Sequence, residues 1–201
     1  MYLIRVEMDK NNPTTRRAMV DCQQMHRFVT RLFGSDRQSS GLLYRTKVVQ
    51  DKVLIYLYSQ NPVSNPDQND IQQRDISGWM DTFKNGQVLN FDLVTSPSKK
   101  VSVEGKRNSQ RKILRDPADR QAWLVKKAAE SGFRILHAEE QDRITATGIH
   151  NTEKGGVMNH SGYRYVGTLQ ITDVNSFRQS LAQGIGPGKA YGFGMMLVKQ
   201  L

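Results

Sequence analysis

Residues 2–33 read YLIRVEMDKNNPTTRRAMVDCQQMHRFVTRLF, and this stretch sets the pattern of the fold. Its first part, residues 2–8, predicts a β-strand. Asn12 and Pro13 then provide a helix N-cap and a proline at the first helical position, where the missing N–H costs nothing. The segment up to Phe33 has apolar residues three or four positions apart, as on one face of a helix. These residues are Ala18, Cys22, Met25, Val29 and Leu32.

The rest of the first half continues as strand, strand, helix and strand. Residues 41–48 and 52–58 are two strand candidates, and the second contains the apolar run VLIYLY. A helix is expected around residues 70–82. Residues 87–96 alternate apolar and polar side chains, which indicates a half-buried strand.

The second half repeats this order without detectable sequence identity to the first. Asp116 and Pro117 form another N-cap and proline pair, and Asp173 is a further candidate cap. The expected elements are a short strand near 101–103, a helix at 117–131, a strand at 133–138, a polar loop at 142–162, a strand at 163–171, a helix at 174–184 and a strand at 190–199.

Both halves therefore fit the βαββαβ order of the ferredoxin-like unit, which is also the RRM-like order. We expect an α+β protein with two tandem ferredoxin-like domains. The predicted domains are residues 1–96 and 97–201, with the boundary near Ser96 and Pro97.

Composition narrows the class of protein. The chain has 201 residues, and its 29 Lys and Arg against 19 Asp and Glu give a net charge of +10. The single cysteine, Cys22, excludes a disulfide framework and a cysteine-based zinc site and favours a reducing compartment. No apolar run is long enough for a membrane span, and the N-terminus does not resemble a signal peptide. We expect an intracellular protein whose positive charge favours a nucleic acid, an anionic membrane or an acidic protein as partner.

The positive charge is concentrated in residues 98–115, SKKVSVEGKRNSQRKILR, where seven basic side chains oppose one glutamate. Valines before Gly105 and Ile113 and Leu114 after it suggest a hairpin with a basic tip. Such a ribbon would neutralise the phosphates of a nucleic acid. The alternative is a solvated linker between two domains.

A second motif is GIGPGKAYGFG, residues 184–194. Its glycines would let backbone N–H groups approach a phosphate closely, and Lys189 adds a full charge. The alternative is a tight turn from helix to strand that needs glycine for positive φ. The Walker A pattern is absent from the sequence, so nucleotide hydrolysis has no support.

Histidine is the remaining candidate for chemistry, because the sequence has no metal-binding or nucleophile motif. His26 lies between the apolar stripe of its helix and a polar face that carries Arg27 and Arg31. It is either a general acid or base, or an ordinary histidine at the edge of the core. His150 and His160 fall in the predicted polar loop, so catalysis from there would require the loop to order on binding.

Four stretches together point to one family: MYL at 1–3, MHRFVTRLF at 25–33, AWL at 122–124 and GIGPGKAYGFG at 184–194. In this combination the chain resembles the CasE repeat-processing endoribonucleases of type I-E CRISPR systems, which are subunits of the Cascade complex. The resemblance covers essentially the whole chain. It implies two tandem ferredoxin-like domains, in agreement with the pattern of strands and helices.

The resemblance also implies a function. The chain would bind the CRISPR repeat stem-loop, cut once at its 3′ base without a metal or other cofactor, and stay bound to the crRNA with other Cascade subunits in the cytoplasm. His26 matches the catalytic histidine, and Gln23 stands where some members have a tyrosine. The residues expected to meet RNA are Arg27, Arg31, Lys99, Lys100, Lys106, Arg107, Arg111, Lys112, Gly186, Gly188 and Lys189.

The chemistry needs few catalytic groups, because RNA carries its own nucleophile in the 2′-OH beside the scissile phosphate. His26 would act either as the base for this hydroxyl or as the acid for the departing 5′-oxygen. Two other functions stay open on the sequence. One is a non-catalytic subunit that binds hairpin RNA, and the other is a scaffold whose basic hairpin binds an acidic protein.

Overall fold

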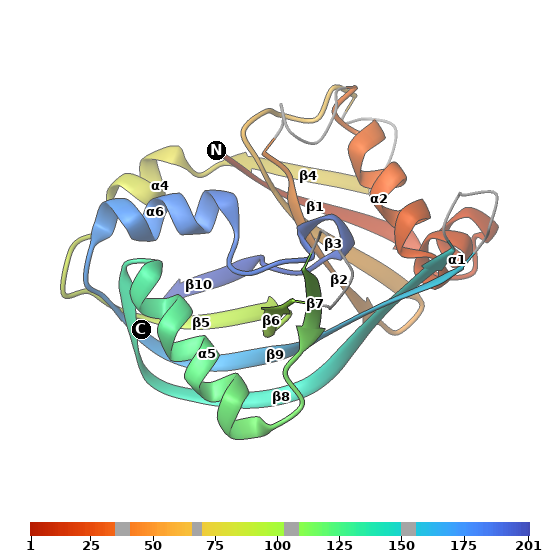
Figure 1. Ribbon diagram of the computed structural model, residues 1–201. Coiled ribbons are helices and arrows are strands. Elements are labelled where there is room, and N and C mark those ends of the chain that lie inside the picture. Colours follow the sequence, from red (N-terminus) through yellow and green to blue (C-terminus); the bar gives the residue numbers. More distant parts are fainter. Residues whose placement is uncertain (35–40, 66–69, 103–108, 150–155) are drawn as a thin grey trace.

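The computed structural model describes residues 1–34, 41–65, 70–102, 109–149 and 156–201, and contains two four-stranded antiparallel sheets (Figure 1). The first sheet has the order β2-β3-β1-β4. Its strands are β1 (Tyr2–Asp9), β2 (Leu43–Val49), β3 (Lys52–Ser59) and β4 (Asp70–Asp75). The first three match the predicted strands.

Two helices, rather than the single predicted one, follow β1. They are α1 (Pro13–Val20) and α2 (Cys22–Arg31), and the break lies at Asp21, whose backbone is extended at φ −130° and ψ 109°. The Asp21 carboxylate accepts a hydrogen bond from the N–H of Gln23 at 2.9 Å and so caps α2. Asn12 caps α1 as predicted.

The helix predicted at residues 70–82 is wrong in its first part. Residues 70–75 form β4, which pairs with β1 from Tyr2 to Glu7, and only the short α4 (Ser77–Asp81) is helical. The sequence DIQQRD has no apolar helical stripe, so the free edge of β1 decides its conformation. The described residues between β3 and β4, 60–65, contain no helix.

The second sheet has the order β10-β5-β9-β8. Its strands are β5 (Val88–Thr95), β8 (Phe133–Ile149), β9 (Val157–Ile171) and β10 (Met196–Gln200). The predicted strand at 87–96 therefore forms, but it pairs with β9 and β10 rather than with the first sheet. A division of the chain after residue 96 thus separates β5 from the sheet to which it belongs.

Helices α5 (Pro117–Glu130) and α6 (Val174–Gln183) complete the second unit (Figure 1). Asp116 and Asp173 cap them as predicted. The last strand is shorter than expected, because residues 189–191 form the 3₁₀ turn η2 (Lys189–Tyr191). In both sheets the first and third strands of the unit are the central neighbours, as the tandem ferredoxin-like fold requires.

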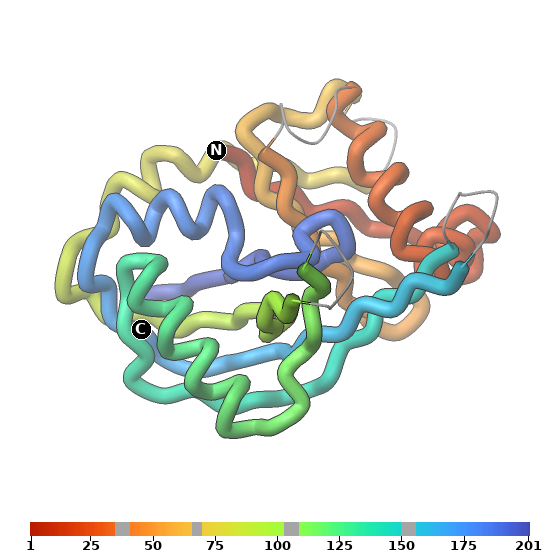
Figure 2. Tube along the Cα trace, in the orientation of Figure 1, coloured from red at the N-terminus to blue at the C-terminus, as the bar shows by residue number. Residues whose placement is uncertain are grey.

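The polar loop predicted at 142–162 is instead part of a long hairpin. β8 continues to Ile149 and pairs with β9 down to Val157, with irregularities after Ile135 and Glu140. Figure 2 shows this hairpin running beyond the sheet to the N-terminal helices. There the Thr147 hydroxyl donates a hydrogen bond of 3.2 Å to the carbonyl of Val20, so the hairpin is held by a tertiary contact.

Apolar side chains gather in two clusters. One joins the inner faces of α1 and α2 to β1 and β3, and Val29 and Ile55 are fully buried in it. The other lies under α5 and α6 but also includes Leu43 and Tyr58 of the first sheet, so the two units share a core. Among the described residues, no helix is both long and apolar enough to cross a membrane.

Candidate functional site

Helix α2 presents His26 at the edge of the core. Met25 and Val29 of the apolar stripe are buried. His26 and Arg27 are half-buried, and Arg31 is exposed. The Thr30 hydroxyl donates a hydrogen bond of 2.8 Å to the carbonyl of His26. Nδ1 of His26 is enclosed by protein atoms, so a ligand would meet this ring at Nε2.

The glycine-rich loop is shaped by its own packing. Gly184, Gly186 and Gly188 have φ of 79°, 87° and 80°, values that other residues rarely adopt. A Cβ on Gly186 would lie 2.6 Å from the hydroxyl of Thr95, which donates a hydrogen bond of 2.7 Å to the carbonyl of Ile185. The turn interpretation thus accounts for these glycines, and contact of Gly186 and Gly188 with phosphate stays a prediction.

Tertiary packing brings this loop to α2. The turn η2 contacts α2 and β2, and the Tyr44 hydroxyl donates a hydrogen bond of 2.8 Å to the carbonyl of Ala190. Lys189, at the start of η2, is half-buried. The structure therefore gathers at one place the helix that carries His26, Arg27 and Arg31 and the loop that carries Lys189.

The long β8–β9 hairpin forms a further wall of this site. The Gln23 side-chain amide lies 3.7 Å from the sulfur of Met158 on β9. A Cβ on Gly148 would come within 2.8 Å of the sulfur of Cys22, so β8 approaches α2 closely. His160, also on β9, stacks on Tyr191 of η2 with ring centroids 4.0 Å apart and planes 15° apart.

Sequence reasoning missed this role of β9. Residues 142–162 are rich in glycine and polar side chains, which is typical of a loop, and only their pairing with β8 makes them a strand. His160 is therefore held on a strand rather than in a loop. His150 lies outside the described residues.

The basic ribbon is an antiparallel hairpin, β6 (Ser98–Val101) with β7 (Gln110–Ile113). Lys99 lies directly opposite Lys112, and Lys100 opposite Arg111. All four side chains are exposed, and they alternate between the two faces of the ribbon. Like charges directly opposite each other destabilise a hairpin, and a bound polyanion would relieve that repulsion. Lys106 and Arg107 lie outside the described residues.

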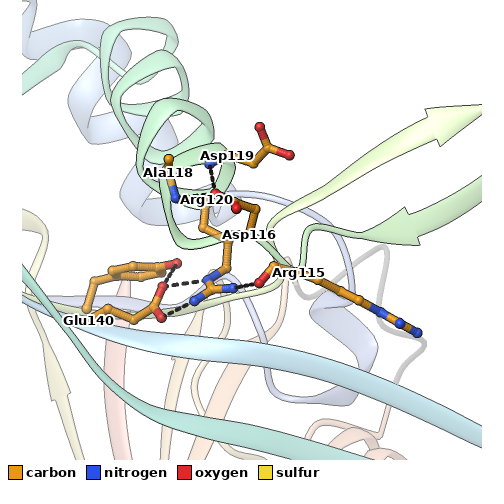
Figure 3. Close-up of polar contacts among 7 residues, drawn as sticks. Arg115, Asp116, Ala118, Asp119, Arg120 and Glu140 are labelled. Atoms are coloured by element: carbon orange, nitrogen blue, oxygen red, sulfur yellow. Dashed lines mark hydrogen bonds and ion pairs between the residues drawn. The ribbon is translucent and has the colours of Figure 1, made fainter.

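An ion pair with a buried arginine and a partly exposed glutamate fixes the base of this hairpin (Figure 3). Arg120 of α5 donates two hydrogen bonds to the carboxylate of Glu140 on β8, at 2.7 and 2.5 Å, and a third to the carbonyl of Arg115 at 2.5 Å. The Tyr165 hydroxyl donates to the same carboxylate at 2.9 Å. The hydrogen bond from Arg120 holds the pKa of Glu140 below its ordinary value, and burial first and this carboxylate second raise the pKa of Tyr165.

A second ion network joins the two sheets. Asp92 of β5 accepts hydrogen bonds from Arg45 of β2 at 2.9 Å and from Arg164 of β9 at 3.1 and 2.8 Å. Burial alone would raise the pKa of Asp92, but the hydrogen bonds from the two arginines outweigh it and keep the pKa low. The network lines a groove of about 430 Å³ between the sheets, α2 and the glycine-rich loop. It therefore fixes the strands on which the site is built.

Metal ligands do not gather in the described part of the chain. Within it, no three His, Cys, Asp or Glu side chains are placed together as they would be to hold a metal ion. The side chains that the site brings together include imidazoles, guanidinium groups, a lysine and a tyrosine, beside the thiol of Cys22 and the carboxylate of Asp92 in the adjoining groove.

Residues 1–200 match the family model described as CRISPR associated protein, and the chain belongs to this family. It is 26% identical over 213 residues to the CRISPR-associated endoribonuclease Cse3 of Thermus thermophilus, covering 98% of this chain and 99% of that one.

Solved structures share the fold. A structure of the CRISPR endoribonuclease Cse3 bound to a 19-nucleotide RNA superposes with a TM-score of 0.82 at 23% identity, over 99% of this chain and 100% of the other. A chain of a CRISPR RNA-guided surveillance complex in a pre-nicking state gives a TM-score of 0.77 at 24% identity, over 100% of both chains. The predicted tandem ferredoxin-like fold is thus confirmed.

Proposed function

We propose that this protein is an endoribonuclease that binds the CRISPR repeat stem-loop of precursor crRNA and cuts it once, at the 3′ base of the hairpin. The observation that carries the proposal is the similarity over nearly its whole length to the endoribonuclease Cse3. The position of a half-buried imidazole beside a cationic loop supports it independently.

The proposed reaction uses the RNA's own 2′-OH. The 2′-oxygen forms a bond to the adjacent phosphorus while the bond from phosphorus to the 5′-oxygen breaks, which leaves a 2′,3′-cyclic phosphate and a 5′-OH. One proton leaves the 2′-OH and one reaches the 5′-oxygen. His26 transfers one of these protons through Nε2, and no metal ion takes part.

Cationic groups from three elements would hold the RNA. Arg27 and Arg31 follow His26 on α2, and Lys189 lies on the adjoining turn, where a positive charge stabilises the charge that develops on the phosphorane. The exposed basic side chains of β6 and β7 would follow the phosphates of the stem, because the deep major groove of A-form RNA excludes most side chains. Lys106 and Arg107, outside the described residues, stay predicted RNA contacts.

We also propose that the protein keeps its product and joins other Cascade subunits in the cytoplasm. The likeness to a chain of a CRISPR RNA-guided surveillance complex supports this assembly. A short ribbon with four exposed cationic side chains is suited to retaining an RNA stem after the cut.

A cleavage assay in EDTA tests the enzyme. The probe is the repeat RNA of the CRISPR array that accompanies the gene, incubated with wild type and with His26→Ala. We expect one cut by wild type, a rate lower by about 10²–10⁴-fold in the variant, and unchanged binding. The same RNA with a 2′-deoxy residue at the cut is the control and should stay intact.

The outcomes of this cleavage assay distinguish the proposed endoribonuclease from the alternative functions. Equal cutting by both proteins would remove His26 from the mechanism. Binding without cutting by wild type would favour the non-catalytic RNA-binding subunit, and a requirement for added Mg²⁺ would contradict the metal-independent reaction.

A further inference from the structure

We propose that His160 is a second catalytic residue, which transfers the proton that His26 does not. The inference deepens the proposed endoribonuclease function and rests on it. It arises from one contact that the structure reveals, the stacking of His160 on Tyr191 of the glycine-rich loop, with ring centroids 4.0 Å apart.

His160 is held in place from several sides. It lies opposite Ala146 in the β8–β9 pairing, and the flat face of its ring rests on Tyr191. The next residue, Ser161, accepts a hydrogen bond of 2.7 Å at its carbonyl from Ser96 and one of 3.1 Å at its hydroxyl from Arg143. An imidazole fixed in this way is preorganised for a reaction, because its position does not depend on ordering by the substrate. Nε2 of His160 is enclosed by protein atoms, so the proton would pass through Nδ1 of this ring.

The same contacts place His160 beside the helix that carries His26. Met158 precedes His160 by two residues, so their side chains leave the same face of β9, about 7 Å apart. Met158 in turn contacts Gln23, three residues before His26 and on the adjoining helical surface. On the other side Tyr191 belongs to η2, which itself contacts α2. The two histidines are therefore on neighbouring walls of one site.

The chemistry needs two proton transfers, and the site offers two imidazoles. The group at position 23 is a glutamine amide, which neither takes nor gives a proton near neutral pH. Histidine has an ordinary pKa of about 6.5 and does both. In the proposed pair one ring accepts the proton of the 2′-OH, the other donates a proton to the 5′-oxygen, and exchange with water restores both rings.

The test uses two versions of the repeat hairpin, the natural RNA and one in which sulfur replaces the 5′-oxygen at the cut. A thiolate departs without protonation, so the sulfur substrate no longer needs the general acid. The proteins are wild type, His26→Ala and His160→Gln. His137→Gln is the matched control, because His137 lies on the neighbouring strand β8 and is exposed beside Glu139.

We expect His160→Gln to cut the natural RNA about 10²–10⁴-fold more slowly than wild type. With the sulfur substrate, one of the two site variants should regain the wild-type rate, and that variant identifies the acid. Binding of the 2′-deoxy-blocked hairpin and the thermal unfolding midpoint should be unchanged. His137→Gln should behave as wild type.

The proposal is overturned if His160→Gln cuts the natural RNA at the wild-type rate. It is also overturned if His160→Gln is slow and neither variant recovers with the sulfur substrate, since a merely structural histidine would give that result. If wild type itself does not cut the natural RNA, the proposed endoribonuclease function fails instead.

Discussion

The two hairpins of the second half, β6–β7 and β8–β9, hold their positions by different physical means. The short hairpin projects four exposed cationic side chains, with like charges directly opposite each other. Its own cross-strand pairs oppose its formation, and the ion pair between the buried Arg120 and Glu140 fixes its base.

The long hairpin is held at both ends. Near α5 it belongs to the second sheet, and at its far end it meets α1 and α2 through neutral contacts, such as Gln23 with Met158 and Thr147 with Val20. The exposed charge of the short hairpin is thus suited to a charged partner, and the long hairpin packs against the helices that carry the proposed site. The concentration of basic residues in the sequence predicted the short hairpin. No local pattern in the sequence predicted the long hairpin.

The largest effect on stability is expected from Arg120→Ala. The change leaves the carboxylate of Glu140 with Tyr165 alone and frees the carbonyl of Arg115. Because Arg120 is buried but Glu140 is partly exposed to water, the expected loss is about 2 kcal/mol. Urea denaturation measures the loss in the free energy of unfolding. Lys127→Ala is the control on the same helix, because its pair with Glu130 is exposed to water and contributes little to stability. Equal losses in both variants would contradict a special role for Arg120.

An intermediate effect is expected on the salt dependence of RNA binding when the charge of the β6–β7 hairpin is removed. The changes are to glutamine at Lys99, Lys100, Arg111 and Lys112. The slope of log affinity for the repeat hairpin against log salt concentration should flatten by about 3, since each lost phosphate contact removes about 0.7–0.9. The fold should be as stable as before or slightly more so, because the cross-strand repulsion is gone.

The control for the ribbon removes the same charge elsewhere. Glutamine at four exposed positions outside the hairpin, Lys84, Lys126, Arg134 and Lys199, should leave the slope nearly unchanged. A flattening as large as in the ribbon variant would mean that net charge, and not the hairpin, guides the RNA.

The smallest expected effect is a loss of local stability at the base of the short hairpin at acidic pH. The pKa of Glu140 is lower in the folded protein than its ordinary value of 4.5, so its contribution to stability is present above that value and is lost as the pH falls through the folded pKa. Hydrogen exchange should show the base of the short hairpin opening on acidification before the contact of the long hairpin with α2. Glu140→Gln should remove this difference, and simultaneous opening of both regions would contradict it.

The fold could be predicted where local signals and tertiary pairing agree. Caps at Asn12, Asp116 and Asp173 and apolar stripes located α1, α2, α5 and α6, because both signals act within one helix. The strand at 70–75 and the long hairpin could not be predicted in this way, because a polar segment becomes a strand only when a neighbouring edge supplies its hydrogen bonds.

The residues of the candidate site also differ in whether the sequence alone could identify them. His26 was recognisable from its place on the helix and from the family resemblance, and the structure adds that its Nδ1 faces protein, which leaves Nε2 as the atom to meet a ligand. His160 had no local signal, because its neighbours in the sequence resemble a loop and its aromatic partner Tyr191 lies on a different element.

The sequence by itself determined the charge, the helices that carry their own caps and apolar stripes, and the identity of the residues that can move protons or bind phosphate. Only the tertiary structure decided that β5 joins the second sheet and that α2, η2 and β9 meet in one site. The physical reason is the range of the interactions. Helix caps and apolar stripes depend on residues only a few positions apart in the sequence. Strand pairing and ring stacking instead join residues far apart in the chain, and their relative positions are fixed only when the core packs.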